Sequence, residues 1–309
     1  PATDTPFTGW LLTEALRDAG IPAGVFNFVT GGGRSVGQTL VDHPDVAGIT
    51  FTGSYDVGMG IIRTFTTGKY PRPCVAEMGG KNPAIISNKA DLDKAALGAM
   101  RSAFGLQGQK CSALSRLYVH KDVKDEFMKK FVDLTAKINV GDPTDQNNWM
   151  GPVINKSAQE DYMGFVDDLR QNGDIVFGGK VVDEKGYYVA PTIADHVPED
   201  HKLWKQEMFL PIVMVEAFDD FDEVMNKAND VEYGLTAGFF SEDEDEIQWF
   251  LDNMEAGVLY VNRAAGATTG AWPGYQSFGG WKGSGSTGKA AGSFYYVQQY
   301  KEQSQTIID

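Results

Sequence analysis

Cys111 has the surroundings of a nucleophilic thiol. It lies at the centre of the stretch Gly105 to Arg116, which reads G-L-Q-G-Q-K-C-S-A-L-S-R. A cysteine attacks as the thiolate, so a reactive cysteine needs a loop or a helix end with polar, electropositive neighbours, and Gln109, Lys110 and Ser112 are of this kind. A cysteine seen alone is more often a small buried residue. The assignment of Cys111 as a catalytic nucleophile therefore depends on a second reactive group.

Glu77 is the candidate for that second group. It follows an apolar stretch and opens the motif E-M-G-G-K-N-P, in which Gly79 and Gly80 let the backbone approach a ligand closely. A partly buried carboxylate with a tuned pKa acts as a general base toward a thiol or a water molecule. The sequence thus predicts that a thiol and a carboxylate, far apart in the chain, act on one substrate.

The first part of the chain has the order helix, strand, glycine turn, helix, strand. This order is half of a doubly wound parallel sheet, in which ligands bind at the carboxyl ends of the strands. The expected elements are a helix from Pro6 with Thr5 as its cap and Gly20 at its end, a strand over 25–29, a turn at 31–33, a helix over 35–41 and a strand over 48–51.

Two turns of this region have the features of an anion site. From Gly32 to Gly37 the sequence reads G-x-x-x-x-G, which is not the G-x-G-x-x-G dinucleotide fingerprint, and the alternative is a plain turn. After F-T-G-S, the helix that begins beyond Ser54 directs its free N–H groups at a ligand. The alternative for Ser54 is a simple helix cap.

The remainder of the chain predicts a second α/β domain, because segments with helical spacing of apolar residues alternate with short apolar strands. The acidic run Glu242 to Glu246 precedes such a helical stripe, so we expect it in the first turn of a helix, where the macrodipole favours it, and we assign it no function. The segment 293–308 alternates like an extended strand. We place a partial dinucleotide-binding domain at 1–76, a catalytic domain at 77–290 and a terminal oligomerisation segment at 291–309.

Composition excludes several classes of partner. The chain has 309 residues, 42% hydrophobic and 22% charged, which is typical of a globular protein. A net charge of −15 argues against nucleic acid and anionic membranes as partners. The four histidines lack metal-ligand spacing, so we propose no metal site. Two cysteines in so long a chain indicate free thiols and a reducing compartment, and Cys74, beside Val75 and Ala76, reads as buried and inert.

Five motifs together resemble the aldehyde dehydrogenase superfamily, in its order and at similar spacings. The resemblance covers essentially the whole chain, although a long amino-terminal region of the family has no counterpart here. The motifs are F-T-G-S at 51–54, E-M-G-G-K-N-P at 77–83, G-Q-K-C-S-A at 108–113, E-M-F-L-P at 207–211 and F-G-G-W-K-G-S-G at 278–285.

The resemblance implies a cofactor site for NAD, with NADP as the alternative. In the family the positions of Ser54, Gly32 and Gly37 lie against the pyrophosphate and nicotinamide ends of the cofactor. The position of Glu207 holds the nicotinamide ribose, and the position of Phe209 packs beside the nicotinamide. We therefore expect these five residues to bind the cofactor.

The substrate is expected to carry a carboxylate. The small-residue loop 262–271 offers consecutive backbone N–H groups of the kind that cradle a carboxylate, and the alternative is a flexible surface loop. The combination of Ser112 with the pair Gly270 and Ala271, a few residues before Phe278, is similar to the pattern in pyrroline-5-carboxylate dehydrogenases. These enzymes oxidise glutamate semialdehyde. These four residues are the expected substrate contacts.

The implied reaction passes through a thioester on Cys111, which is hydrolysed by a water molecule that Glu77 activates. In the family, an asparagine from the amino-terminal region helps to hold the oxyanion. The family also implies a homo-oligomer joined by the terminal strand, in the cytoplasm or in an organelle matrix. Two alternatives remain open: an aldehyde dehydrogenase for another substrate, and an inactive fragment that acts only as an assembly module.

Overall fold

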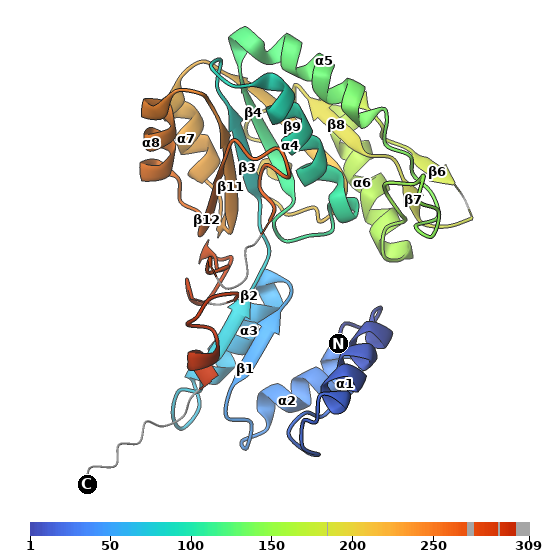
Figure 1. Cartoon of the computed structure of the whole chain (residues 1–309), viewed down its shortest axis with the longest axis vertical. Helices are drawn as coiled ribbons and strands as arrows, with labels where there is room; N and C mark the ends of the chain where they lie inside the picture. Colours follow the sequence, from blue (N-terminus) through green and yellow to red (C-terminus); the bar gives the residue numbers. More distant parts are fainter. Residues whose placement is uncertain (184, 271–274, 290, 301–309) are drawn as a thin grey trace. The chain divides into compact units, whose positions relative to one another are not determined.

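A computed structural model describes residues 1–183, 185–270, 275–289 and 291–300, and its chain divides into two compact units (Figure 1). The small unit comprises Pro1–Ile49 and Met59–Cys74, and the large unit comprises Thr50–Gly58 and the chain from Val75 onward. Each unit is described by itself below.

The small unit is mostly helical. It contains α1 (Pro6–Asp18), the π-helical turn η1 (Gly33–Gly37), α2 (Gln38–Asp42) and most of α3 (Tyr55–Thr66). The predicted helix from Pro6 is confirmed, although the Thr5 side chain forms no capping hydrogen bond.

The strand expected over 25–29 is wrong. This segment is irregular, and Val25 and Val29 are 70% and 53% exposed. A strand is stabilised by hydrogen bonds to a neighbouring strand, and no strand in the described part of the chain pairs with this segment.

The large unit is built on a seven-stranded sheet with the order β12-β11-β3-β4-β9-β8-β5 (Figure 1). Neighbouring strands are parallel except for the antiparallel pair β5 and β8. The strands are β3 (Asn82–Ile86), β4 (Leu114–His120), β5 (Asp174–Phe177), β8 (Thr192–Asp195), β9 (Ile212–Phe218), β11 (Thr236–Phe240) and β12 (Val258–Val261).

Helices cover both faces of this sheet, so the predicted α/β architecture is confirmed. Alternate residues of a strand point to opposite faces: Ile85 packs with one cluster of buried residues, whereas Ala84 and Ile86 pack with the other. Helices α6 (Lys156–Asn172), α7 (Phe221–Asn229) and α8 (Glu244–Asn253) bury their apolar stripes in the first cluster, and α4 (Leu92–Phe104) and α5 (Lys124–Thr135) bury theirs in the second.

Shorter elements complete the chain. The predicted strand over 293–308 is wrong for 293–300, where turns lead into the 3-10 helix η5 and no neighbouring strand in the described residues pairs with it, while 301–309 lie outside the described residues. The other short elements are β1 (Ile49–Thr52), β2 (Cys74–Glu77), β6 (Val181–Asp183), β7 (Tyr188–Val189), β10 (Tyr233–Gly234), β13 (Trp281–Lys282), η2 (Gly105–Gly108), η3 (Lys121–Val123), η4 (Lys202–Trp204) and η5 (Val297–Tyr300).

Candidate active site

Three sequence motifs meet at one edge of the large sheet. The motif from Glu77 leads into β3, the segment around Cys111 leads into β4, and the motif from Glu207 leads into β9. These strands are adjacent and parallel, in the order β3-β4-β9, so the residues before them gather at the edge where the strands begin. The candidate site therefore lies at the amino ends of the catalytic strands, opposite to the edge that the doubly wound rule favours.

A left-handed turn delivers the chain from α4 to Cys111. Leu106, Gln107 and Gly108 have φ angles of 52°, 58° and 65° in succession. A Cβ on Gly108 would lie 2.3 Å from the carbonyl oxygen of Leu210, so glycine allows the turn to pack directly on the segment that follows Glu207.

The backbone of Cys111 is fixed by the first residue of β3. The buried Asn82 side chain donates from Nδ2 to the carbonyl oxygens of Cys111, at 2.8 Å, and Ala113, at 2.9 Å. Its Oδ1 accepts from the Thr236 N–H at 3.1 Å. Gly80 also packs tightly here, because a Cβ would lie 2.4 Å from the Cys111 carbonyl oxygen. The sequence analysis did not identify Asn82, although it lies inside the motif that starts at Glu77.

Glu77 carries an unpartnered buried carboxyl group. Both of its carboxyl oxygens are buried and form no hydrogen bond with any described residue. Burial raises the pKa of Glu77 to about 8. A general base needs a pKa near neutral pH and oxygens that are not used in structural hydrogen bonds, so that they can bind a substrate or a water molecule. The Glu77 carboxyl group has both properties.

The backbone around Glu77 is held by the motif at 278–285, which lies about two hundred positions later in the chain. The Met78 N–H donates to the Ser284 carbonyl oxygen at 2.9 Å, and the Ser286 N–H donates to the Ala76 carbonyl oxygen at 3.0 Å. The Ser284 hydroxyl donates to the Gly79 carbonyl oxygen at 2.7 Å. These bonds explain why two motifs so distant in sequence belong to one site.

The thiol of Cys111 is electrostatically coupled to two carboxyl groups. Burial, followed by the charges of Glu207 and Glu77, raises the pKa of Cys111 to about 11, against the opposing effect of the Ser112 and Cys111 N–H groups. Burial also lowers the pKa of Lys110. The expected electropositive setting is therefore wrong: the charges that dominate are negative, and the resting group is a thiol that needs a base.

Glu207 is tied to the glycines that follow Glu77. The Gly80 N–H donates to its Oε1 at 2.9 Å, and a Cβ on Gly79 would lie 2.1 Å from Oε2. Burial raises the pKa of Glu207, while the Gly80 N–H and Lys81 act in the opposite direction. Two positions later, Phe209 has a φ of 54° and is 45% exposed, so its ring is open to a ligand.

The small-residue loop reaches the nucleophile through its second half. Thr268 is fully buried, and its hydroxyl donates to the Ser112 carbonyl oxygen at 2.7 Å. Gly270 has a φ of 126°, and its carbonyl oxygen accepts from the Tyr260 hydroxyl at 2.8 Å. Ala271 lies outside the described residues. Phe278 exchanges two backbone hydrogen bonds with Ala291, at 2.8 and 3.0 Å.

The remaining predicted cofactor residues fall in different units. Ser54 lies in the large unit directly before α3 and is exposed, and its carbonyl oxygen accepts from the Gly58 N–H at 3.0 Å. In the small unit Gly32 directly precedes η1 and Gly37 is its last residue, with φ angles of −70° and −59°. A Cβ at Gly37 would meet no atom within 4 Å, so no neighbour in the described chain requires a glycine there.

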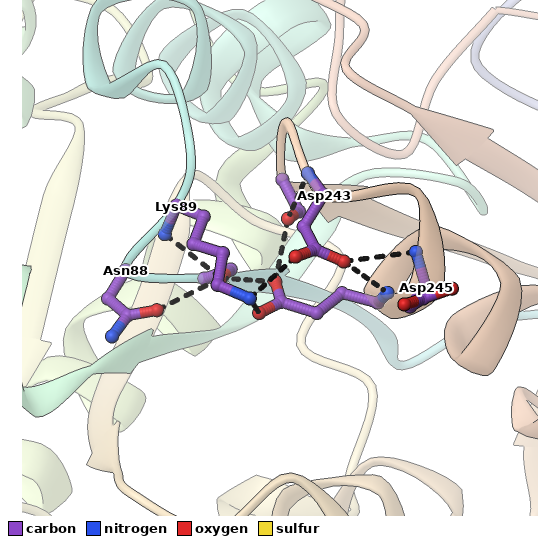
Figure 2. A network of polar contacts seen from close by, with 7 residues as sticks. Asn88, Lys89, Asp243 and Asp245 are labelled. Atoms are coloured by element: carbon purple, nitrogen blue, oxygen red, sulfur yellow. Dashed lines mark hydrogen bonds and ion pairs between the residues drawn. The ribbon is translucent and has the colours of Figure 1, made fainter.

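The acidic run Glu242 to Glu246 forms a structural network at the opposite edge of the sheet (Figure 2). As predicted, it opens a helix: the Asp243 side chain caps α8 by accepting from the N–H groups of Asp245 and Glu246. Lys89, which follows β3, lies 2.6 Å from Asp243 and 2.9 Å from Glu246. The network joins the end of β3 to the start of α8.

Two further site types find no support in the described residues. Nowhere in 1–183, 185–270, 275–289 and 291–300 do three or more His, Cys, Asp or Glu side chains gather as a metal site would require. Within the same ranges no helix is long and apolar enough to span a membrane.

Comparison with known proteins identifies the family. The model of the aldehyde dehydrogenase family matches residues 1–306. A 1-pyrroline-5-carboxylate dehydrogenase of Bacillus mycoides (strain KBAB4) is 42% identical over 316 residues, which cover 99% of this chain and 60% of that protein. The chain therefore spans about 60% of the length of this relative.

Solved structures agree in fold. A crystal structure of 1-pyrroline-5-carboxylate dehydrogenase from Thermus with bound NAD matches with a TM-score of 0.92 at 35% identity, over 97% of this chain and 58% of that chain. The gamma-glutamyl-gamma-aminobutyraldehyde dehydrogenase of Burkholderia cenocepacia J2315 matches with a TM-score of 0.90 at 35% identity, over 97% and 60%. The motifs, the sheet and these matches agree, and the chain belongs to the aldehyde dehydrogenase family.

Proposed function

We propose that this chain oxidises an aldehyde to a carboxylic acid through a thioester on Cys111. The observation that carries the proposal is the coupling of the Cys111 thiol to the unpartnered, buried carboxyl group of Glu77 at one edge of the sheet. A nucleophile and a base of suitable pKa at one point are what acyl chemistry at an aldehyde carbon requires. Membership of the aldehyde dehydrogenase family supports the reaction class.

The residues near the thiol fit the nicotinamide end of NAD or NADP. Glu207 is a partly buried carboxylate held by one backbone N–H, which leaves its other oxygen for a ribose hydroxyl, and Phe209 presents an exposed aromatic face. We assign both to the cofactor, and the cofactor contacts of Ser54, Gly32 and Gly37 stay predictions from the sequence. When bound, the nicotinamide supplies the hydride acceptor.

The chain's own residues account for the proton steps. The sulfur of Cys111 bonds to the aldehyde carbon, and the thiol proton passes to the Glu77 carboxylate. The N–H groups of Cys111 and Ser112, which favour negative charge on the sulfur, are the donors that we propose for the oxyanion. Glu77 then releases the thiol proton to solvent. After hydride loss, a water molecule gives a proton to Glu77 and attacks the thioester, the acid is released, and the Cys111 sulfur takes the proton back from Glu77.

The proposed substrate is glutamate semialdehyde, with glutamate as product. The loop 262–271, through Gly270 and Ala271, is with Ser112 and Phe278 the proposed site for the substrate carboxylate. The relatives named 1-pyrroline-5-carboxylate dehydrogenase support this choice. The Burkholderia structure, similar in TM-score and named for another aldehyde, supports the runner-up, an aldehyde dehydrogenase with a different substrate.

The test is NADH or NADPH formation by the purified chain, with glutamate semialdehyde and with butanal. We expect kcat/KM for the charged aldehyde to be at least about tenfold higher, since one well-placed polar contact contributes about 1.4 kcal/mol or more. A higher value for butanal would overturn the substrate assignment. A Cys111→Ala variant is the control for background oxidation. No activity until the remaining part of a longer relative is added would indicate an assembly module instead.

We also propose that the chain forms a homo-oligomer through its terminal segment. Phe294, Tyr295 and Val297 are 82%, 54% and 71% exposed, so three apolar side chains that are close in the sequence lie on the surface. Sedimentation velocity of the chain and of a Phe294→Ser/Val297→Ser variant tests this proposal, and identical masses at equal concentration would refute it.

A further inference from the structure

A closed set of buried hydrogen bonds joins α4, the small-residue loop and the nucleophile segment. The Thr268 N–H donates to Ser102 Oγ at 3.0 Å, and the Ser102 and Thr268 hydroxyl oxygens are 2.8 Å apart. The Thr268 hydroxyl donates to the Ser112 carbonyl oxygen at 2.7 Å. Because that bond uses the only proton of the Thr268 hydroxyl, Ser102 must donate to Thr268, which fixes every proton in the set.

The set is shielded from water. Ser102 and Thr268 are fully buried, and Ser112 is 8% exposed. The backbone of the loop is also seated between two glycines: a Cβ on Gly98 would lie 2.6 Å from the Arg263 carbonyl oxygen, and a Cβ on Gly238 would lie 2.3 Å from the Ala267 carbonyl oxygen. The loop therefore cannot shift along α4 without breaking buried hydrogen bonds, each of which costs about 1–3 kcal/mol when a partner is lost.

The hydrogen bonds of Thr268 also connect the proposed carboxylate site to the segment that carries Cys111. Thr268 is two residues before Gly270, in the proposed carboxylate site, and its hydroxyl bonds to the residue directly after Cys111. It is the short route by which a ligand held at the end of the loop would act on the backbone that orients the sulfur.

We propose that Thr268 is a positioning residue that couples occupation of the carboxylate site to the orientation of Cys111. The proposal rests on the proposed function for the location of the carboxylate, and it adds a specificity mechanism. Binding energy from the carboxylate, which is remote from the reacting carbon, is used to align the nucleophile. The charged aldehyde then gains in the rate of attack as well as in affinity.

The test uses alkylation of Cys111, which needs no cofactor. In 5-iodopentanoate the reactive carbon and the carboxylate carbon have the same separation as in glutamate semialdehyde, and 5-iodopentanamide lacks the charge. In each reaction a bond from sulfur to carbon forms, the carbon–iodine bond breaks, iodide leaves and the thiol proton passes to solvent. Peptide mass mapping separates modified Cys111 from modified Cys74.

We expect the acid to alkylate the unmodified chain about tenfold faster than the amide, and Thr268→Ser, which keeps the hydroxyl, to preserve this ratio. Thr268→Val is expected to reduce the ratio to about one to two, with a much larger fall in the acid rate than in the amide rate, since the loss of one buried hydrogen bond is worth about a factor of ten. Ser102→Ala, which removes the other end of the set, is expected to reduce the ratio in the same direction.

Three results would overturn the proposal: an equal fall of both rates in Thr268→Val, which is the result of a purely structural role; an unchanged ratio in a variant whose circular dichroism spectrum is native; or no preference for the acid in the unmodified chain. The aldehyde oxidation assay is independent of these readouts. A chain that prefers the iodo acid but forms no NADH would contradict the proposed function and leave the coupling intact.

Discussion

The two edges of the large sheet each carry a pair of acidic side chains, and the two pairs are in opposite states. At the edge where the strands begin, burial raises the pKa of Glu77 and of Glu207. At the other edge the pKa of Asp243 lies below its ordinary value. Burial alone would raise the pKa of Glu246, but hydrogen bonds from Ser241 and Ser87 and the charge of Lys89 lower it.

The difference lies in the partners. Glu246 Oε2 accepts hydrogen bonds from the hydroxyls of Ser87, at 2.5 Å, and Ser241, at 2.6 Å, and Oε1 lies 2.9 Å from Lys89. The two carboxyl oxygens of Glu77 form no hydrogen bond with a described residue. A satisfied carboxylate stabilises the fold, whereas an unsatisfied one costs stability and is available for chemistry. The comparison therefore separates a structural carboxylate from the one that we propose as the general base.

Glu77→Gln sharpens the comparison most. The amide is nearly the same size but cannot accept a proton, so we expect kcat for aldehyde oxidation to fall by about 10²- to 10⁴-fold, as for other general bases. Stability at pH 8 should not fall. Rapid mixing with substrate in excess over the chain should show an NADH burst followed by slow turnover, if Glu77 acts mainly on water. Unchanged steady-state turnover would contradict the assignment.

Glu246→Gln should have the reverse effect. The amide oxygen can still accept from the two serines, but its nitrogen then faces the Lys89 ammonium, donor against donor. We expect the free energy of unfolding to fall by about 1–3 kcal/mol, measured by urea denaturation. The rate of Cys111 alkylation per folded molecule should match that of the unmodified chain, and a large change would mean that the two edges are coupled.

The pH dependence of stability should also have opposite signs at the two edges. Glu77 has an unfolded pKa near 4.5 and a folded pKa of about 8, so between these values the folded state binds more protons and stability falls as pH rises. Glu246 contributes stability above its unfolded pKa that is lost as pH falls through its lowered folded pKa.

After allowance for solvent screening, we expect Glu77 to cost about 1–2 kcal/mol at pH 8.5 relative to pH 5. The measurement is urea denaturation at both pH values for the unmodified chain and for Glu77→Gln. The difference between the two proteins should grow with pH. A constant difference would mean that Glu77 ionises at its ordinary pKa.

The smallest expected effect concerns Glu207. Two carboxylate charges raise the pKa of Cys111, and the charge of Glu207 contributes more than that of Glu77. Glu207→Gln removes this charge, so the pKa of Cys111 should fall and alkylation by iodoacetamide at pH 8 should become about two- to fivefold faster, in proportion to the thiolate fraction. Glu246→Gln is the matched control at the other edge and should leave the rate unchanged. A slower reaction in Glu207→Gln would show that the carboxylate assists the thiol.

Local patterns predicted most of the elements correctly. The spacing of apolar residues predicted the alternation of helices and strands that forms the large unit, and the acidic run from Glu242 to Glu246 opens α8 as expected. The failures are strands. Residues 25–29 and 293–300 have strand-like patterns but no neighbouring strand among the described residues. Helix α1 illustrates the same limit: it forms as predicted, yet Leu11 and Leu12 are 52% and 57% exposed.

Helical hydrogen bonds are local, so a helix is set by its own residues, while a strand and a buried face require partners elsewhere. The same distinction applies to the site. The motifs around Glu77, Cys111 and Glu207 were identifiable in the sequence because their glycines and reactive side chains are adjacent in the chain. The roles of Asn82, which fixes the nucleophile, and Thr268 were not identifiable, because their partners are distant in sequence.

The sequence by itself determined the family, the chemical types of the reactive groups and the local structure that carries them. Only the tertiary structure decided that these groups meet at the amino edge of β3, β4 and β9, that the Glu77 carboxyl group has no hydrogen-bond partner among the described residues, and that the charges of Glu207 and Glu77 act on the Cys111 thiol. The physical reason is that desolvation and Coulomb interactions depend on distances in space, which residue order does not specify until the strands have paired.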